Sequence, residues 1–324
     1  MDHNLLGKTG LNVSRLSFGA SALGSVFRPI NEAEGIRAVH AALDAGINYF
    51  DVAPAYGGTV AETVLGKALR DVPRDRYFLS TKAGKYAAPG TYGLDDLDYS
   101  ASRICAELEE SMRRLGTDYV DIVHLHDFEY QQFSKTEDAF ALGFPALAAL
   151  KDEGLIGAVG AGIYPMELWN RVIGQAPVDV VMVHNHYCLN DRRGLELVPG
   201  CEAREIGMIN ASPFASGLLT GGDAPDWHPA SAEICEVFAQ AATFCSEQGS
   251  SIAKLAFQFA SQDSPFQTTM FSTARPSSVE RNVAWYSEAI DKSLLAEVLE
   301  ILAPVADHQW DYDAGIERAL GDSP

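Results

Sequence analysis

The feature that most constrains the fold is a repeated alternation of short apolar runs with longer amphipathic segments. Eight apolar runs, each short enough for one strand, are separated by stretches with helical spacing. Strands that alternate with helices form parallel sheets, so eight such units predict an α/β fold, the closed (β/α)8 or TIM barrel. The predicted strands lie near residues 12–18, 47–52, 77–82, 119–125, 156–162, 178–184, 206–211 and 268–273.

Two of the helical segments carry end signals. Asn31 followed by Glu34 resembles a capping box at the start of the first helix. Another helix is predicted from about Ser100 to Leu115, and Gly116 is expected to end it. Three long connections, 83–99, 127–142 and 214–231, follow predicted strands and are expected to be loops above the barrel.

Length and charge limit the classes of protein to consider. The 324 residues, 47% of them hydrophobic, suit one barrel, so residues 1–324 are expected to form a single domain. The net charge of −20 disfavours nucleic acid and anionic membrane as partners. The N-terminus lacks a basic segment followed by an apolar run, and no apolar stretch approaches about 18 residues. We expect a protein without a membrane span that acts on small molecules.

The cysteines indicate a reducing compartment. They are odd in number and scattered, and none forms a C-x-x-C pair, which is typical of reduced thiols in a cytoplasmic protein. They are Cys105, Cys188, Cys201, Cys235 and Cys245.

Residues suited to proton transfer follow three successive predicted strands. Asp51 and Tyr56 come after INYFDVA, Lys82 ends RYFLSTK, and His126 ends the strand that contains DIVHLH. Parallel barrel strands point their carboxyl ends at one rim, so these side chains are expected to converge there. A phenol keeps its proton to pH about 10, and exchange near neutrality therefore requires help from a nearby cation.

These residues lie in motifs that resemble those of the aldo-keto reductases. FDVAPAYGGTVAETVLGKAL is similar to the family signature D-x-A-x-x-Y-G followed by E-x-x-L-G. The similarity extends from GKTGLNVSRLSFGAS through GLLTGG to SSVERNV. Within the family, FGASALGSVF, HLHDFE, ASPFASGLLT and PDWHPAS most resemble the branch of L-galactose dehydrogenases and the bacterial enzymes that act on L-fucose.

The resemblance implies an NAD-dependent oxidation of the C1 hydroxyl of an aldose to a lactone. No side chain accepts hydride, so a nicotinamide must be bound. Tyr56 is expected to be the general base in oxidation and the acid in reduction, with Lys82 lowering its pKa and Asp51 orienting Lys82. His126 is expected to position the C1 oxygen.

Family positions also predict the cofactor contacts. Members that use NADPH carry Lys and Arg after the last strand, where this chain has Ser272 and Ser278, which favours NAD. Arg275 and Arg281 lie nearby, so NADP stays possible. Pyrophosphate contacts are expected from the backbone of GLLTGG, where glycines permit close approach. The predicted dinucleotide-binding residues are Gly19, Ala20, His184, Ser212, Leu218, Ser272, Ser278 and Asn282.

Two departures affect the nicotinamide contacts. Gly162 and Ile163 stand where many members have Ser-Asn, and Ala211 replaces a stacking Tyr. His184 and Asn185 on the sixth strand are candidates to replace those contacts.

The substrate is expected to meet aromatic and polar residues of the loops, which suit a sugar. They are Tyr86, Asp127, Phe128, Trp227 and His228.

Three alternatives remain open at this level. The pairs His124/His126 and His184/His186 have ligand spacing for a metal-dependent barrel hydrolase, although the first strand lacks an H-x-H. The second alternative is a barrel that binds the cofactor but catalyses no reaction. The third is an NADP(H)-dependent reductase of aldehydes or ketones, with pyridoxal among related substrates. The preferred hypothesis, an NAD-dependent aldose dehydrogenase, requires no metal. The resemblance also implies a monomer, which is the usual oligomeric state of the family.

Overall fold

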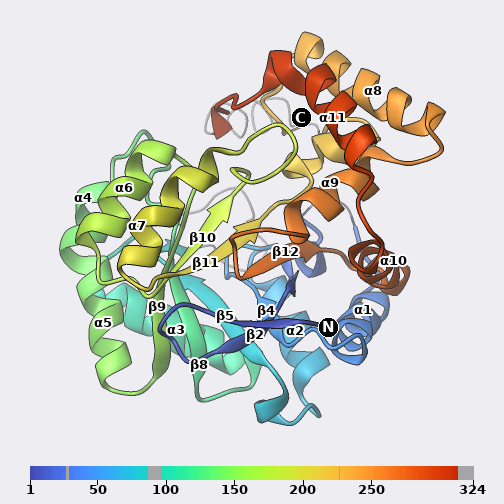
Figure 1. Cartoon of the computed structure of the whole chain (residues 1–324). Helices are drawn as coiled ribbons and strands as arrows, with labels where there is room; N and C mark the ends of the chain where they lie inside the picture. Colours follow the sequence, from blue (N-terminus) through green and yellow to red (C-terminus); the bar gives the residue numbers. More distant parts are fainter. Residues whose placement is uncertain (27–28, 87–95, 226, 313–324) are drawn as a thin grey trace, which may run out of the picture.

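The computed structural model describes residues 1–26, 29–86, 96–225 and 227–312. Its centre is a closed barrel of parallel strands in the order β10-β11-β12-β3-β4-β5-β8-β9 (Figure 1). This confirms the predicted (β/α)8 fold. The barrel strands are β3 (Leu16–Gly19), β4 (Tyr49–Asp51), β5 (Phe78–Ala83), β8 (Val120–His126), β9 (Ile156–Ile163), β10 (Val180–His184), β11 (Gly207–Ala211) and β12 (Thr268–Ser272).

The first predicted strand, 12–18, is wrong as a single element. Strand β2 (Asn12–Ser14) pairs antiparallel with β1 (His3–Leu5), and β3 begins only at Leu16. The chain turns at Arg15, whose amide donates to the Asp2 carbonyl at 2.8 Å. The hairpin places Leu6 and Val13 in the cluster that fills the barrel interior. The predicted run 12–18 therefore contributes to two sheets. Its first half belongs to the hairpin that closes the amino-terminal end of the barrel, and its second half belongs to the barrel itself.

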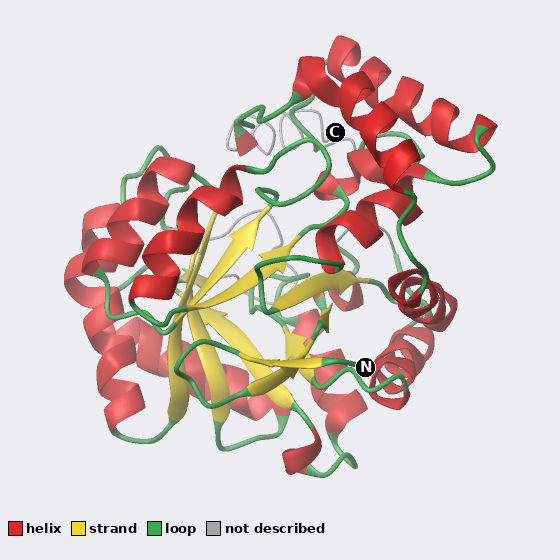
Figure 2. Cartoon of the chain, in the orientation of Figure 1, coloured by secondary structure: helices red, strands yellow, loops and turns green. Residues whose placement is uncertain are grey.

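Helices surround the barrel (Figure 2). The predicted caps are confirmed, since the Asn31 side chain accepts from the Glu34 amide at 3.0 Å and Gly116 ends α3 in the left-handed region at φ 71°. Helices α8 and α11 pack against each other beyond the carboxyl-terminal side of the barrel (Figure 1). The helices are α1 (Glu32–Asp44), α2 (Val60–Leu69), α3 (Ala101–Leu115), α4 (Thr136–Asp138), α5 (Phe144–Asp152), α6 (Met166–Gln175), α7 (Val198–Ala203), α8 (Ala232–Glu247), α9 (Ile252–Ser261), α10 (Pro276–Ser287) and α11 (Lys292–Leu302).

Apolar side chains plug the barrel below its carboxyl-terminal rim. Tyr49, Ile122, Ile209 and Met270 meet in this interior cluster and are almost completely buried. Burying each such side chain contributes about 1.5–3 kcal/mol, so the layer is well stabilised. The polar residues that follow on the same strands therefore lie directly above a layer of buried apolar side chains.

The three predicted long loops differ in how much regular structure they contain. The 83–99 connection includes a short hairpin of β6 (Lys85–Tyr86) and β7 (Asp96–Leu97), and residues 87–95 lie outside the described residues. The prediction for 127–142 is wrong in its second half, because α4 begins at Thr136 and a π-helical turn, Ala139–Gly143, continues it. The 214–231 connection starts with the 3-10 segment η5 (Ala215–Thr220).

Candidate active site

The predicted proton-transfer residues converge at the carboxyl ends of neighbouring strands β4, β5 and β8. Asp51 and Lys82 form a buried ion pair, each with 2% of its surface exposed. The Lys82 Nζ also donates to the Val52 carbonyl at 2.9 Å. Tyr56, from the turn after β4, hydrogen-bonds Lys82 through its phenol, and the Lys82 Nζ lies 5.0 Å from its ring centroid. The His126 ring stands perpendicular to that of Tyr56, with centroids 6.1 Å apart.

Packing behind these residues holds them in place. The Ser80 hydroxyl donates to Asp51 Oδ1 at 2.6 Å and accepts from the Tyr49 hydroxyl at 2.8 Å. The turn that carries Tyr56 lies directly against Gly24, where an added Cβ would come within 2.5 Å of the Tyr56 carbonyl oxygen. Only glycine allows this approach, so Gly24 helps to set the height of the phenol.

The electrostatics of Tyr56 differ from the prediction. Burial raises its pKa to about 12, and the neighbouring Lys82 ammonium only partly opposes that rise. For Lys82 itself, burial acts to lower the pKa, but the Asp51 carboxylate and the Tyr56 phenol raise it above its ordinary value. Without ligands, the phenol is therefore protonated and the amine charged at neutral pH. Lys82 acts to lower the pKa of Tyr56, as the sequence predicts, but burial of the phenol outweighs this effect, so the net shift is upward.

His126 is neutral at physiological pH. Burial lowers its pKa to about 3, outweighing the opposite effect of Asp127. Its Nε2 lies 3.5 Å from Asp127 Oδ1, and its backbone carbonyl accepts from the Tyr99 hydroxyl at 2.7 Å. A neutral imidazole keeps one N–H donor, which suits it to hold a substrate oxygen without giving up a proton.

A second lysine, which sequence reasoning did not single out, also lies at the rim. Lys85, on β6, forms an ion pair with Asp127, with Nζ 2.7 Å from Oδ2, and its ammonium lies 4.1 Å from the Tyr130 ring centroid. Its position three residues after Lys82 is a weak sequence signal. The Asp127 carboxylate is thus flanked by a histidine and a lysine, and its pKa is lowered despite its burial.

The opposite side of the rim is lined by aromatic rings and further imidazoles. His184, at the end of β10, lies within 6.0 Å of Tyr164 and 5.9 Å of Tyr312, ring centroid to centroid. The His228 ring packs edge-on against Trp310 at 4.8 Å. Burial lowers the pKa of both His184 and His228 to about 4. These rings are therefore neutral and can stack on or hydrogen-bond a ligand.

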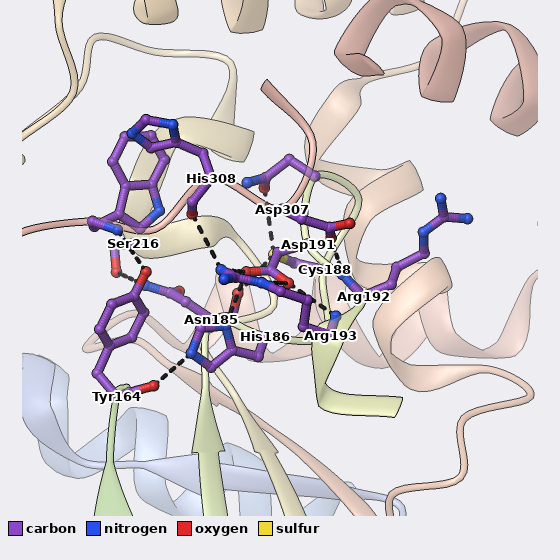
Figure 3. A network of polar contacts seen from close by, with 12 residues as sticks. Tyr164, Asn185, His186, Cys188, Asp191, Arg192, Arg193, Ser216, Asp307 and His308 are labelled. Atoms are coloured by element: carbon purple, nitrogen blue, oxygen red, sulfur yellow. Dashed lines mark hydrogen bonds and ion pairs between the residues drawn. The ribbon is translucent and has the colours of Figure 1, made fainter. Parts of the chain in front are cut away.

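Part of this wall comes from the C-terminal segment, residues 306–312, which a polar network ties to the strand ends (Figure 3). The Arg192 amide donates to Asp307 Oδ1 at 3.0 Å, and the Trp310 amide donates to the Tyr164 hydroxyl at 2.8 Å. Asn185 donates to the Tyr312 hydroxyl at 2.5 Å. Residues 313–324 lie outside the described part of the chain.

The histidine pairs do not assemble a metal site in the described part of the chain. His186 is fully engaged, with Nδ1 2.9 Å from Asp191 Oδ2 and Nε2 2.5 Å from the Tyr164 carbonyl (Figure 3). The His124 ring lies against Gly160, where a Cβ would come within 2.2 Å of Nδ1. Within residues 1–26, 29–86, 96–225 and 227–312, no three His, Cys, Asp or Glu side chains converge as a metal ion would require. The hydrolase alternative has no support here.

Most predicted dinucleotide residues line the rim between β10 and β3. The Ser272 hydroxyl accepts from the Ala22 amide at 3.0 Å and from the Ser21 hydroxyl at 2.8 Å, which joins the end of β12 to the turn after β3. On α10, the Arg281 guanidinium bonds the Ser278 hydroxyl at 3.3 Å and stacks on Trp285. Leu218 is buried in η5, and Ser212 takes a left-handed backbone at φ 60°. Gly19 ends β3 and pairs with Asp51 on β4, and the amide of the following Ala20 donates to the Asp51 carbonyl at 2.7 Å.

Unpartnered polar atoms fit the predicted dinucleotide. The Asn282 Oδ1 and the Asn185 Oδ1 are buried acceptors without a hydrogen-bond partner. Such orphaned groups cost free energy unless a ligand pairs them. At Gly162, an added Cβ would meet nothing within 4 Å, so the backbone leaves space above β9. The residues present therefore fit an adenine and a carboxamide at the two predicted places.

Two predicted substrate residues make side-chain contacts within the protein. Phe128 is completely buried, and its ring packs on Tyr99, Phe140 and Phe144 in the core outside the barrel. The prediction for Phe128 is wrong because the left-handed backbone of Asp127, at φ 49°, breaks the alternation of the strand, so Asp127 stays beside His126 and Phe128 turns into the core. Tyr86 receives the Arg103 guanidinium on its ring at 4.1 Å, so it packs against α3.

Comparison with known proteins identifies the family. The sequence profile described as "Aldo/keto reductase family" matches residues 15–303. The chain belongs to this family. This aldo/keto reductase is therefore an oxidoreductase, and the nicotinamide cofactor of the family is NAD or NADP.

Named relatives of this aldo/keto reductase include several dehydrogenases. L-galactose dehydrogenase of Arabidopsis thaliana is 39% identical over 314 residues, which cover 94% of this chain and 95% of the relative. D-threo-aldose 1-dehydrogenase of a Pseudomonas species is 31% identical, covering 90% and 94%. Pyridoxal 4-dehydrogenase of Microbacterium luteolum is 28% identical, covering 88% and 93%. The fold is similar to that of an aldo-keto reductase from Bacillus halodurans, with a TM-score of 0.76 at 24% identity over 96% of this chain and 98% of that chain.

No helix among the described residues is long and apolar enough to cross a membrane. All five cysteines carry free thiols.

Proposed function

We propose that this enzyme oxidises the C1 hydroxyl of an aldose, such as L-galactose or L-fucose, to the lactone with NAD. The observation that carries the proposal is the convergence of Tyr56, Lys82 and Asp51 beside His126 at the rim of the barrel. Similarity to an L-galactose dehydrogenase and to a D-threo-aldose 1-dehydrogenase supports the aldose as substrate.

In this reaction the Tyr56 phenol first loses its proton to solvent, and the resulting phenolate takes the C1 hydroxyl proton. The phenolate forms against the Lys82 ammonium, which stabilises it by charge and hydrogen bonding. Asp51 keeps Lys82 charged and fixed, because an isolated buried ammonium would otherwise lose its proton. The bound dinucleotide supplies the hydride acceptor.

His126 and the polar rim hold the sugar. The neutral His126 donates an N–H to the C1 oxygen, which keeps that oxygen facing the Tyr56 phenol. Asp127 offers a carboxylate to sugar hydroxyls, and His228 has a buried Nε2 without a partner. Since the Nδ1 of His228 accepts from the Ala230 amide at 3.1 Å, its Nε2 carries the hydrogen and acts as a donor. Trp227 lies beside His228 and Tyr312, where it can cover the face of the ring.

The cofactor preference is argued from α10. Ser272 and Ser278 offer no positive charge to a 2′-phosphate, and Arg281 is engaged by Ser278 and Trp285. This favours NAD. The second candidate is an NADP(H)-dependent reductase of aldehydes or ketones, and the position of Arg281 on the same helix favours it. In that case Arg281 would leave Trp285 to bind the phosphate.

A substrate screen tests the proposal. L-galactose, L-fucose and D-arabinose are each mixed with NAD or NADP at equal concentration, and the absorbance of the reduced cofactor is followed. We expect turnover of at least one aldose, faster with NAD. Turnover of aldehydes with NADPH but of no aldose would support the reductase. Tight dinucleotide binding without any turnover would instead indicate a cofactor-binding protein without activity.

We further propose that the enzyme acts as a monomer in the cytoplasm. The free thiols of all five cysteines support a reducing compartment. Light scattering of the purified protein at several concentrations tests the monomer, for which one mass near 35.0 kDa is expected.

A further inference from the structure

Asp127 divides its two carboxylate oxygens between two neighbours. Its Oδ2 lies 2.7 Å from Lys85 Nζ, and its Oδ1 lies 3.5 Å from His126 Nε2. The residue directly follows β8 with a left-handed backbone at φ 49°, and its amide donates to the Gly162 carbonyl at 3.0 Å. Aspartate adopts this backbone more readily than most residues. The side chain is thereby turned beside the histidine that precedes it.

The surroundings of His126 distinguish its two neutral tautomers. Its Nδ1 is buried and has no hydrogen-bond partner. A hydrogen on Nδ1 would be an unpaired buried donor, and it would leave the Nε2 lone pair facing a carboxylate oxygen. A hydrogen on Nε2 instead places the proton on the nitrogen 3.5 Å from the negatively charged Asp127 carboxylate, which favours it electrostatically and leaves the N–H able to donate to a substrate oxygen. The environment therefore prefers the Nε2–H tautomer.

We propose that Asp127, oriented by Lys85, is a positioning residue that keeps His126 in the Nε2–H tautomer. This inference rests on the proposed function, because it takes His126 as the donor to the C1 oxygen. Only the Nε2–H tautomer offers that donor at the nitrogen near the rim. Asp127 acts through His126, and the Lys85 ammonium fixes which carboxylate oxygen faces it.

Nitrogen NMR of the enzyme tests the tautomer directly. The protein is labelled with 15N-histidine, and two-bond proton–nitrogen spectra are recorded at pH 7.5 with and without NAD. The chain has 8 histidines, so the His126 signals are assigned by their loss in His126→Gln. We expect the Nε2–H pattern in the native enzyme. An Nδ1–H pattern in the native enzyme would overturn the proposal.

Asp127→Asn provides a sharper test, because the Lys85 ammonium can only donate and therefore pairs with the amide oxygen of the new side chain. The NH2 group of the new side chain then faces His126 and favours a lone pair on Nε2, so the pattern should change to Nδ1–H. Adding Lys85→Met frees the amide to turn, and the double variant should regain the Nε2–H pattern. Lys85→Met alone should keep it, since a carboxylate offers only acceptors.

Asp138→Asn is the matched control, because Asp138 pairs with Lys135 at 3.2 Å on the exposed surface of α4. It should leave both spectra and turnover unchanged. For Asp127→Asn we expect kcat to fall by at least about tenfold while the Kd for NAD stays within about twofold. Retention of the Nε2–H pattern in Asp127→Asn would reject the proposal, whatever the change in kcat.

The two proposals fail in different ways. If no aldose is oxidised but the spectra change as described, the substrate is wrong and the tautomer assignment stands. If aldoses are oxidised and the spectra do not change, the function stands and Asp127 has no positioning role. Should Asp127→Asn not fold, as judged by circular dichroism, the native spectrum and that of Lys85→Met still decide the proposal.

Discussion

The two sides of the barrel rim are built differently. On the side of β4, β5 and β8, Asp51 and Lys82 project from strands and have several hydrogen-bond partners within the protein. On the side of β10, the lining comes largely from loops and from the C-terminal segment, and Asn185 and His228 keep buried atoms without partners. The Asp51–Lys82 pair on the first side has its hydrogen-bond partners before any ligand binds, whereas Asn185 and His228 on the second side do not have all of theirs.

This difference separates chemistry from recognition. Groups that move a proton must be held within about half an ångström, which the strands and the turn packed against Gly24 achieve. Groups that select a ligand can come from loops, and their unpaired atoms are satisfied only when the right partner arrives. We therefore expect substitutions on the strand side to change kcat, and substitutions on the loop side to change KM.

The largest effect is expected from Tyr56→Phe. Removing the phenol oxygen abolishes the proton path while leaving nearly all of the ring surface, so kcat should fall by about 10³-fold or more. The Kd for NAD, measured by fluorescence titration, should stay nearly the same. If turnover survives this change, Tyr56 does not have its proposed role, and the contrast between a catalytic side and a recognition side of the rim fails as well.

Lys82→Met should be the most destabilising of these changes. It leaves the Asp51 carboxylate buried without its cation, which costs about 3–5 kcal/mol. Urea unfolding should show this loss, and the double variant with Asp51→Asn should recover part of it. Equal stability of the native protein and Lys82→Met would mean that the pair is not buried in solution.

The pH dependence sharpens the comparison further. Oxidation requires the Tyr56 phenolate, and burial raises the pKa of that group to about 12, so kcat/KM should increase with pH between about 7 and 10. Reduction uses the protonated phenol and should be nearly constant over that range. His126 and His184, with pKa values of about 3 and 4, should add no transition near neutrality. Initial rates in both directions measure this, and an oxidation rate independent of pH would contradict it.

The smallest effect is expected on the loop side. Tyr312→Ala removes the ring that packs on His184 and the hydroxyl that holds Asn185, so KM for the aldose should rise by about tenfold. The change in kcat should be less than about threefold. Leu155→Ala, at an exposed position just before β9 and therefore at the opposite end of the barrel from the rim, is the control and should change neither. A drop in kcat larger than the rise in KM for Tyr312→Ala would erase the distinction between the two sides.

Sequence reasoning succeeded where the signal is local. Apolar runs and helix caps predicted the barrel strands, and the regular order of parallel units placed Asp51, Lys82 and His126 at one rim. It failed at Phe128, whose inward or outward direction depends on the backbone of Asp127 just after the strand. Lys85 was missed because its partner, Asp127, is 42 residues away in the chain.

The sequence by itself determined the repeating strand and helix units, the residues available for proton transfer and the family. Those properties follow from periodicity and short motifs, which involve neighbours along the chain. Only the tertiary structure decided the charge states and the second side of the rim. The raised pKa of Tyr56 comes from burial, and the position of Tyr312 depends on contacts with Asn185, 127 residues earlier. Desolvation and long-range contacts exist only once the chain has closed on itself.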